Sequence, residues 1–274
     1  MHPDFAAHGY LAVPGFKRQS ELDAVRTRAA ELVQAFDPDS NRTVFTTREQ
    51  DRQVDDYFLE SAHTVRCFFE EEAFDDQGRL KQDKALSINK IGHALHDLEP
   101  VFDHFSHGPE LAEMARQCGL AQPQLRQSMV IFKQPGIGGE VRWHQDATFF
   151  DTTPVSVTTF WFALEDAHVG NGCLWVQPGG HRSALRERFV RTGNRAAIEP
   201  LDATPWPDDR SARPLEVAAG TLLVFHGLLP HYSAPNRSAA SRHAYTLHVT
   251  DANTSYADTN WLQPAQSRAL RGFV

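Results

Sequence analysis

Paired cysteines, clustered basic residues and long apolar runs are all missing from this 274-residue sequence. Its three cysteines lie far apart and form no C-x-x-C pair, so no disulfide framework is indicated. We expect them to be buried thiols in a reducing compartment. No run approaches the ~18 apolar residues that a membrane-spanning helix needs, so we expect no membrane contact. Nucleophile-elbow, P-loop and dinucleotide-binding motifs are also missing.

The formal charge is −8, and the lysines and arginines are scattered rather than clustered. This balance argues against nucleic acid and against an anionic membrane surface as partners. The first residues, MHPDFAAHGYLAVPGF, lack the pattern of a signal peptide, and the last four, RGFV, are not a peroxisomal address. We therefore expect a cytoplasmic protein, and we expect it to be a monomer or a weak homodimer.

The remaining sequence divides into a helix-rich part, 1–123, and a part of short strands, about 124–252. Helical spacing of apolar residues predicts helices over 20–36, 86–105 and 109–120, and a polar loop over 41–56. The run FFEEEAF at 68–74 predicts a solvated acidic turn. Short β-branched and aromatic runs predict strands within 124–135, 155–167, 172–178, 214–227 and 241–250, with a polar, proline-rich insert at 193–214. We expect one domain, 1–274, mainly β with buttressing helices.

The motif His144-Gln145-Asp146 carries the first chemical signal, because residues i and i+2 of a strand point to the same face. An imidazole and a carboxylate there can supply two ligands to a divalent metal. A second histidine would complete the triangular face that non-haem Fe(II) oxygenases use, although the same set does not exclude zinc. Alone, the motif is equally compatible with a polar turn after a strand.

The segment from His226 to Val249 offers a third ligand and an anion-binding residue. Both His226 and His231 follow apolar runs and could reach the site. Strand alternation over 242–249 places one set of residues on a small, polar face: Arg242, Ala244, Thr246 and His248. It places the other set in the core: His243, Tyr245, Leu247 and Val249. Arg242 could pair with a carboxylate through two hydrogen bonds, or form a surface salt bridge.

These motifs together resemble the phytanoyl-CoA dioxygenase family. The resemblance is carried by H-Q-D, then NGCLWVQPGGH, then a histidine followed eleven residues later by an arginine. It extends from HGYLAVPGF near the start to NWLQP near the end. It implies a double-stranded β-helix (a jelly-roll, cupin-like fold) and an Fe(II)- and 2-oxoglutarate-dependent dioxygenase.

The resemblance also implies a role for individual residues. It places the metal ligands, and hence the catalytic centre, at His144, Asp146 and His231. Arg242 would pair with the distal carboxylate of 2-oxoglutarate. Further positions of the cosubstrate pocket fall on Lys90, Met129 and Trp161, although from sequence alone Lys90 would be a solvated helix residue and the other two would be core.

The expected reaction consumes dioxygen and 2-oxoglutarate, releases succinate and CO₂, and hydroxylates a C–H bond of a small molecule, with ascorbate as a possible stimulant. The presence of Asp146 argues for hydroxylation, because an iron halogenase would have a small residue there. The acidic chain has no basic cluster for the phosphates of coenzyme A. A small polar metabolite or an amino-acid derivative is therefore as plausible as a fatty acyl-CoA. Two alternatives stay open: a non-catalytic cupin-like binding module, and a metal-dependent cupin enzyme that does not use 2-oxoglutarate.

Overall fold

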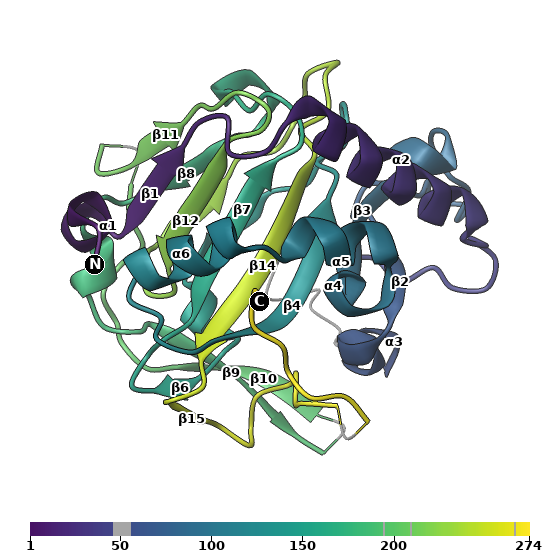
Figure 1. Ribbon diagram of the computed structural model, residues 1–274. Coiled ribbons are helices and arrows are strands. Elements are labelled where there is room, and N and C mark those ends of the chain that lie inside the picture. The colour runs from purple at the N-terminus through teal and green to yellow at the C-terminus, as the bar shows by residue number, and fades with distance from the viewer. Residues whose placement is uncertain (46–55, 194, 209, 266) are drawn as a thin grey trace.

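The computed structural model describes residues 1–45, 56–193, 195–208, 210–265 and 267–274. Its larger sheet has seven strands (Figure 1), in the order β1 (Tyr10–Val13), β12 (Leu222–His226), β7 (Thr158–Ala163), β14 (Ala244–Asp251), β4 (Pro123–Ile131), β3 (Ile88–His93) and β2 (Val65–Phe69). A smaller sheet has the order β11 (Arg213–Leu215), β8 (Leu174–Val176), β13 (His231–Ser233) and β5 (Val141–His144). Neighbouring strands of both sheets are antiparallel.

The two sheets enclose an apolar layer to which both contribute, for example Trp161 and Phe225 from the larger sheet and Leu174 and Val176 from the smaller one. Two-stranded ribbons flank them: β9 (Glu187–Thr192) with β10 (Arg195–Pro200), and β6 (Thr152–Thr153) with β15 (Ser255–Tyr256). This arrangement confirms the predicted double-stranded β-helix.

Helices cover the outer face of the larger sheet. Figure 1 shows α4 (Leu95–Leu98), α5 (Pro100–Ser106) and α6 (Pro109–Gln117) in front of it, with α2 (Gln19–Ala35) running along one edge. The remaining helices are α1 (Pro3–His8) and the short α3 (Asp56–Leu59). Helices were predicted at α2 and α6, and both are present, because apolar residues at helical spacing bury one face of each. No helix in the described ranges is long and apolar enough to cross a membrane.

Strand β14 shows how one strand serves two environments. Tyr245, Leu247 and Val249 join the core beneath the helices, as the alternation predicts. The intervening Thr246 and His248 are also buried but face the interior between the sheets, where His248 lines a cavity. The outer face thus supplies packing, and the inner face supplies polar groups.

The helix predicted over 86–105 is wrong in its first half. Residues 88–93 form β3, a strand paired on both sides, and only the remainder forms α4 and α5. Ile88, Ile91 and Leu95 repeat at helical intervals, but a strand covered on both faces buries both isoleucines equally well. Lys90 therefore lies in a strand and is buried, and is not the solvated helix residue that the spacing predicts.

Two further expectations hold only in part, because strand pairing and burial override local polarity. Glu71 and Glu72 form the predicted turn, but the run 68–74 begins within β2, and Glu70 is fully buried rather than solvated. The insert at 193–214 contains β10, which forms a hairpin with β9. Of the predicted loop at 41–56, residues 46–55 lie outside the described ranges.

Candidate metal centre and cosubstrate pocket

Paired strands of the smaller sheet bring the two predicted histidine ligands together. His144, the last residue of β5, is the register partner of His231, the first residue of β13. Asp146 begins a single 3₁₀ turn, Asp146–Thr148, just after β5. Gln145 between them is extended and points away, and its side-chain amide bonds to the carbonyl of Leu228 and accepts from the backbone of Arg186. These bonds fix the alternation that aims both ligand side chains the same way.

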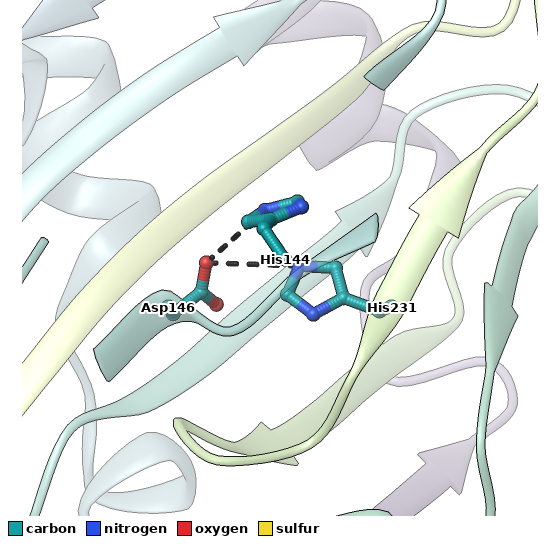
Figure 2. A group of neighbouring side chains, drawn as sticks. All are labelled: His144, Asp146 and His231. Carbon is teal, nitrogen blue, oxygen red and sulfur yellow. Dashed lines mark ion pairs between the residues drawn. The ribbon is translucent and has the colours of Figure 1, made fainter. Parts of the chain in front are cut away.

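The three side chains converge on one small volume (Figure 2). Oδ1 of Asp146 lies 3.5 Å from Nε2 of His144 and 3.6 Å from Nε2 of His231, and the potential ligand atoms all lie within 4.8 Å of one another. Nδ1 of His144 contacts the Arg142 carbonyl at 2.8 Å, and Nδ1 of His231 contacts the Leu229 carbonyl at 3.0 Å. A ring nitrogen facing a carbonyl carries the proton, so each Nε2 keeps its lone pair for a metal.

The charges of the cluster suit metal binding. Burial raises the pKa of Asp146, but the surrounding imidazoles, those of His231 and His248 foremost, outweigh it and hold the pKa well below its usual value. Burial and the neighbouring His144 lower the pKa of His231 to about 4. The hydroxyl of Thr159 donates to Oδ2 of Asp146, which leaves Oδ1 directed at the histidines. The cluster thus holds an ionised carboxylate beside a neutral imidazole, the forms that bind metals.

His226, the other histidine that the sequence offers, lies elsewhere. Its Nδ1 accepts from the backbone of Leu228, and its ring lies 5.6 Å from that of His181. The structure therefore brings His231, and not His226, beside Asp146.

His248 is a site residue that we did not predict. Its Nε2 lies 3.6 Å from Oδ1 of Asp146, and its ring stacks on Phe150 at 4.9 Å. The strand alternation placed it on the inner face, but nothing in the sequence indicates that this face meets Asp146. It is a neighbour of the carboxylate rather than a member of the triad.

A cavity leads to the cluster. It is lined by His144, Asp146 and His248, by the predicted Lys90 and Met129, and by Lys133. Six aromatic side chains form much of its wall: Phe45, Phe58, Trp143, Phe149, Phe150 and Trp261. Lys90 is 5% exposed, and its ammonium lies 3.2 Å from the centre of the Phe45 ring. The cavity therefore combines apolar walls with buried positive charge, as small-molecule sites often do.

The predicted Arg242 and Trp161 do not line this cavity in the described part of the chain but lie next to each other in the interior between the sheets. The guanidinium carbon of Arg242 is 5.4 Å from the Trp161 ring. Arg242 is 1% exposed, and burial lowers its pKa to about 10. It donates to the Gly172 carbonyl at 3.1 Å and to the Ser233 hydroxyl at 3.3 Å, while Nη1 has no partner among the described residues. A buried arginine with a spare donor suits a carboxylate ligand.

The donor set fits the group that the sequence suggests. Two imidazoles and one carboxylate on one face leave room for a bidentate keto acid and dioxygen on an octahedral Fe(II). The unpartnered Nη1 of Arg242 fits the far end of such a keto acid.

Comparison with known proteins identifies the family of the chain. Residues 5–244 match the family described as phytanoyl-CoA dioxygenase (PhyH). The chain is 44% identical over 263 residues to a phytanoyl-CoA dioxygenase of Arabidopsis thaliana, covering 96% of this chain and 92% of that protein. It is 42% identical over 272 residues to phytanoyl-CoA dioxygenase domain-containing protein 1 of Danio rerio, covering 96% and 93%.

Solved structures share the fold. The epimerase SnoN, in complex with Fe³⁺, alpha ketoglutarate and nogalamycin RO, superposes with a TM-score of 0.65 at 17% identity, covering 98% of this chain and 90% of its own. EctD from S. alaskensis, with 2-oxoglutarate and 5-hydroxyectoine, gives 0.62 at 18% identity, covering 93% and 77%.

Proposed function

The chain belongs to the phytanoyl-CoA dioxygenase family and is an iron- and 2-oxoglutarate-dependent dioxygenase, and we propose that His144, Asp146 and His231 are its iron ligands. The observation that carries the proposal is the convergence of three ligand atoms within 4.8 Å from two strands and a turn. We further propose that Arg242 pairs with the distal carboxylate of 2-oxoglutarate and that Lys90, Met129 and Trp161 shape its pocket.

When bound, iron, 2-oxoglutarate and dioxygen supply the oxidising chemistry, with succinate and CO₂ as products of the cosubstrate. The chain contributes position and exclusion of water. The bonds from Nδ1 of His144 and His231 to backbone carbonyls orient both rings. Thr159 orients the carboxylate of Asp146, and the aromatic walls keep the cavity apolar.

We propose that residues 1–274 form a single domain. We also propose that its substrate is a small molecule that is hydroxylated at a C–H bond. Trp143 stacks on Tyr232 beside the cavity at a ring distance of 5.4 Å, and Arg142 lines it. These walls favour a substrate with an apolar body.

The net charge of −8 supports a protein that binds neither nucleic acid nor membranes. We propose that it acts in the cytoplasm as a monomer or weak homodimer.

The test is turnover of 2-oxoglutarate by purified protein with Fe(II), ascorbate and oxygen, with succinate as the readout even without substrate. Asp146→Ala is expected to lose iron and to lower succinate formation at least about a thousandfold, because it removes the only charged ligand of the triad. Asp151→Asn is the matched control: Asp151 is five residues away and pairs with Arg188, outside the triad.

Succinate formation by Asp146→Ala, with iron content measured, would refute the ligand assignment. Wild-type protein that binds iron but forms no succinate would instead favour a binding module or a cupin enzyme that does not use 2-oxoglutarate.

A further inference from the structure

Lys133 is a buried lysine beside the proposed cosubstrate pocket, and it belongs to none of the motifs discussed above. It follows β4, is 2% exposed, and lines the same cavity as His144 and Asp146. It is also the one non-glycine residue in the described ranges with a clearly positive φ, 38°. A buried lysine in a strained backbone is costly, so its presence calls for an interaction that compensates.

Its hydrogen bonds do not neutralise its charge. Nζ donates to the Gly139 carbonyl at 2.6 Å and approaches the Ser233 carbonyl at 3.4 Å. Both acceptors are uncharged, and an ammonium has three donors, so one N–H is left for a ligand. Within the described chain Lys133 forms no ion pair with a carboxylate, whereas buried charges are normally paired.

Arg242 lies close to Lys133. The two cations share a neighbour, since Lys133 approaches the Ser233 carbonyl and Arg242 bonds to the Ser233 hydroxyl. They also meet at Gly172, whose carbonyl accepts from Arg242 and whose Cβ position lies 3.0 Å from Cε of Lys133. Burial and this neighbouring guanidinium lower the pKa of Lys133 well below its usual value. The pair is therefore electrostatically unfavourable without an anion.

One buried carboxylate faces these two cations. Glu70 interacts electrostatically with both, and its Oε2 is engaged by Asn89 and by the backbone of Gly139, while its Oε1 has no partner in the described chain. Glu140 also acts on Lys133 but is exposed. One positive charge is left without a buried counterpart, next to the cavity that Lys133 lines together with His144 and Asp146. A carboxylate would balance it through charge-assisted hydrogen bonds.

We propose that Lys133 is a second cation for the distal carboxylate of 2-oxoglutarate, acting beside Arg242. This inference rests on the proposed function. The carboxylate would then lie between Lys133, which follows β4, and Arg242, which precedes β14. The hydrogen bonds of Lys133 to Gly139 and Ser233 would orient its ammonium group. It also separates Lys133 from Lys90, the other buried lysine of the cavity, which lies against aromatic rings.

The experiment compares two keto acids in oxygen-free Fe(II) protein. 2-Oxoglutarate carries the distal carboxylate, and 2-oxopentanoate has a methyl group in its place. Binding of either is followed by the visible charge-transfer absorption of the iron chelate. Lys133→Met is expected to weaken 2-oxoglutarate about 10- to 100-fold, the value of a charge-assisted hydrogen bond, and to change 2-oxopentanoate less than about threefold.

Lys133→Gln is the second variant, because its amide can still donate to the Gly139 carbonyl and hold the loop if the methionine protein does not fold. It should show the same selective loss. Lys133→Arg, which keeps the charge, should recover most of the preference for 2-oxoglutarate. Lys90→Met changes the other buried lysine of the cavity; because its ammonium lies against aromatic rings, this variant should affect both keto acids alike rather than 2-oxoglutarate selectively.

Two results would overturn the inference while leaving the proposed function intact. Equal weakening of both keto acids would make Lys133 merely structural. Selective loss in Lys90→Met but not in the Lys133 variants would assign the carboxylate to Lys90. Wild-type protein that binds both acids equally would show that the distal carboxylate is not recognised, which would overturn this inference and the proposed role of Arg242 together. If wild-type iron protein binds neither acid, the proposed function fails as well.

Discussion

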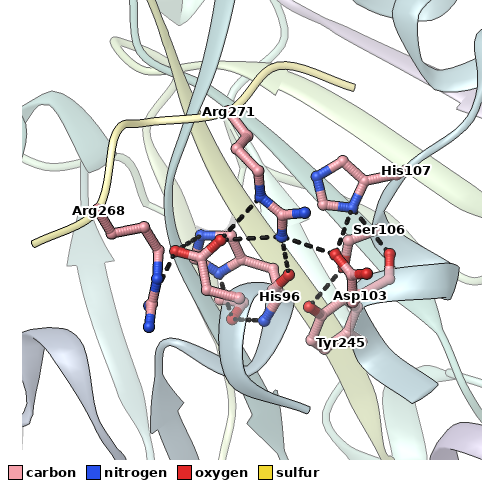
Figure 3. A network of polar contacts seen from close by, with 9 residues as sticks. His96, Asp103, Ser106, His107, Tyr245, Arg268 and Arg271 are labelled. Carbon is pink, nitrogen blue, oxygen red and sulfur yellow. Dashed lines mark hydrogen bonds and ion pairs between the residues drawn. The ribbon is translucent and has the colours of Figure 1, made fainter. Parts of the chain in front are cut away.

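Two polar networks lie on opposite faces of β14, and they differ in how completely the hydrogen bonds of their buried atoms are formed. On the outer face, beneath the helices, Tyr245 bonds to Ser106 at 2.8 Å, and Arg271 reaches both Asp103 and the backbone of His96 (Figure 3). Among the residues labelled in Figure 3, Nε2 of His107 is the buried side-chain atom without a partner.

On the inner face, several groups lack partners within the described residues. Nη1 of Arg242, Nδ1 of His248 and Oε1 of Glu70 are buried and unpaired. Buried polar groups are normally satisfied, so a cluster of exceptions marks a place built for a ligand. The difference between the two faces indicates that the outer network stabilises the fold. The inner network leaves polar groups unpaired, which lowers stability but leaves those groups available to a ligand.

Arg242→Met is the strongest test of this contrast. It should weaken 2-oxoglutarate binding about 100-fold, because a charge-assisted contact with the carboxylate is lost. The free energy of unfolding should be unchanged or higher, because an unpaired buried charge has been replaced by an apolar side chain. Titration of 2-oxoglutarate and urea unfolding of the iron-free protein measure the two effects. A large loss of stability with normal binding would reverse the roles of the two faces.

His96 provides a test of the outer face through pH. Burial lowers its pKa to about 4 from a usual 6.5, and its Nδ1 bonds to the Ser128 hydroxyl at 2.8 Å. The unfolded chain therefore binds a proton at higher pH than the folded chain does. Stability is complete above pH 6.5 and falls progressively as the pH drops towards about 4.

The variant His96→Asn keeps a polar partner for Ser128 but cannot titrate. Urea unfolding with a chelator present, at about pH 7 and about pH 5, should show a smaller loss of stability in the variant than in the wild type, by up to tenfold in the folding equilibrium per pH unit. An equal loss in both proteins would mean that other groups control the acid sensitivity.

Much of the inner face could be predicted from sequence, because it depends on strand alternation. The inward position of His248 follows from the two-residue period of β14, and Arg242 lies two residues before this strand. The shared direction of His144 and Asp146 follows from the same alternation, because Gln145 between them is extended. The choice of His231 over His226 could not be made from these residues alone, because it depends on the register between β13 and β5. The family resemblance supplied that choice.

The rest depended on tertiary contacts that leave no local pattern. Ile88 and Ile91 repeat like helix residues, yet pairing with β2 and β4 makes their segment a strand. Glu70 stands in an acidic run that looks solvated, and only the approach of Asn89 and Gly139 explains its burial. The same contacts surround Lys133, so the second cation of the pocket was hidden for the same reason.

Tyr245→Phe tests the outer network most gently. Its hydroxyl is fully buried and bonds to Ser106, and its ring packs against Phe102 and Phe105. Removing the hydroxyl alone should lower the free energy of unfolding by about 1 kcal/mol and leave 2-oxoglutarate binding unchanged. Ser106→Ala removes the other partner, and the double variant should cost less than the sum of the two single changes, because the bond is lost only once. If Tyr245→Phe altered cosubstrate binding instead, the two faces of β14 would be coupled, and the division between a stabilising face and a binding face would not hold.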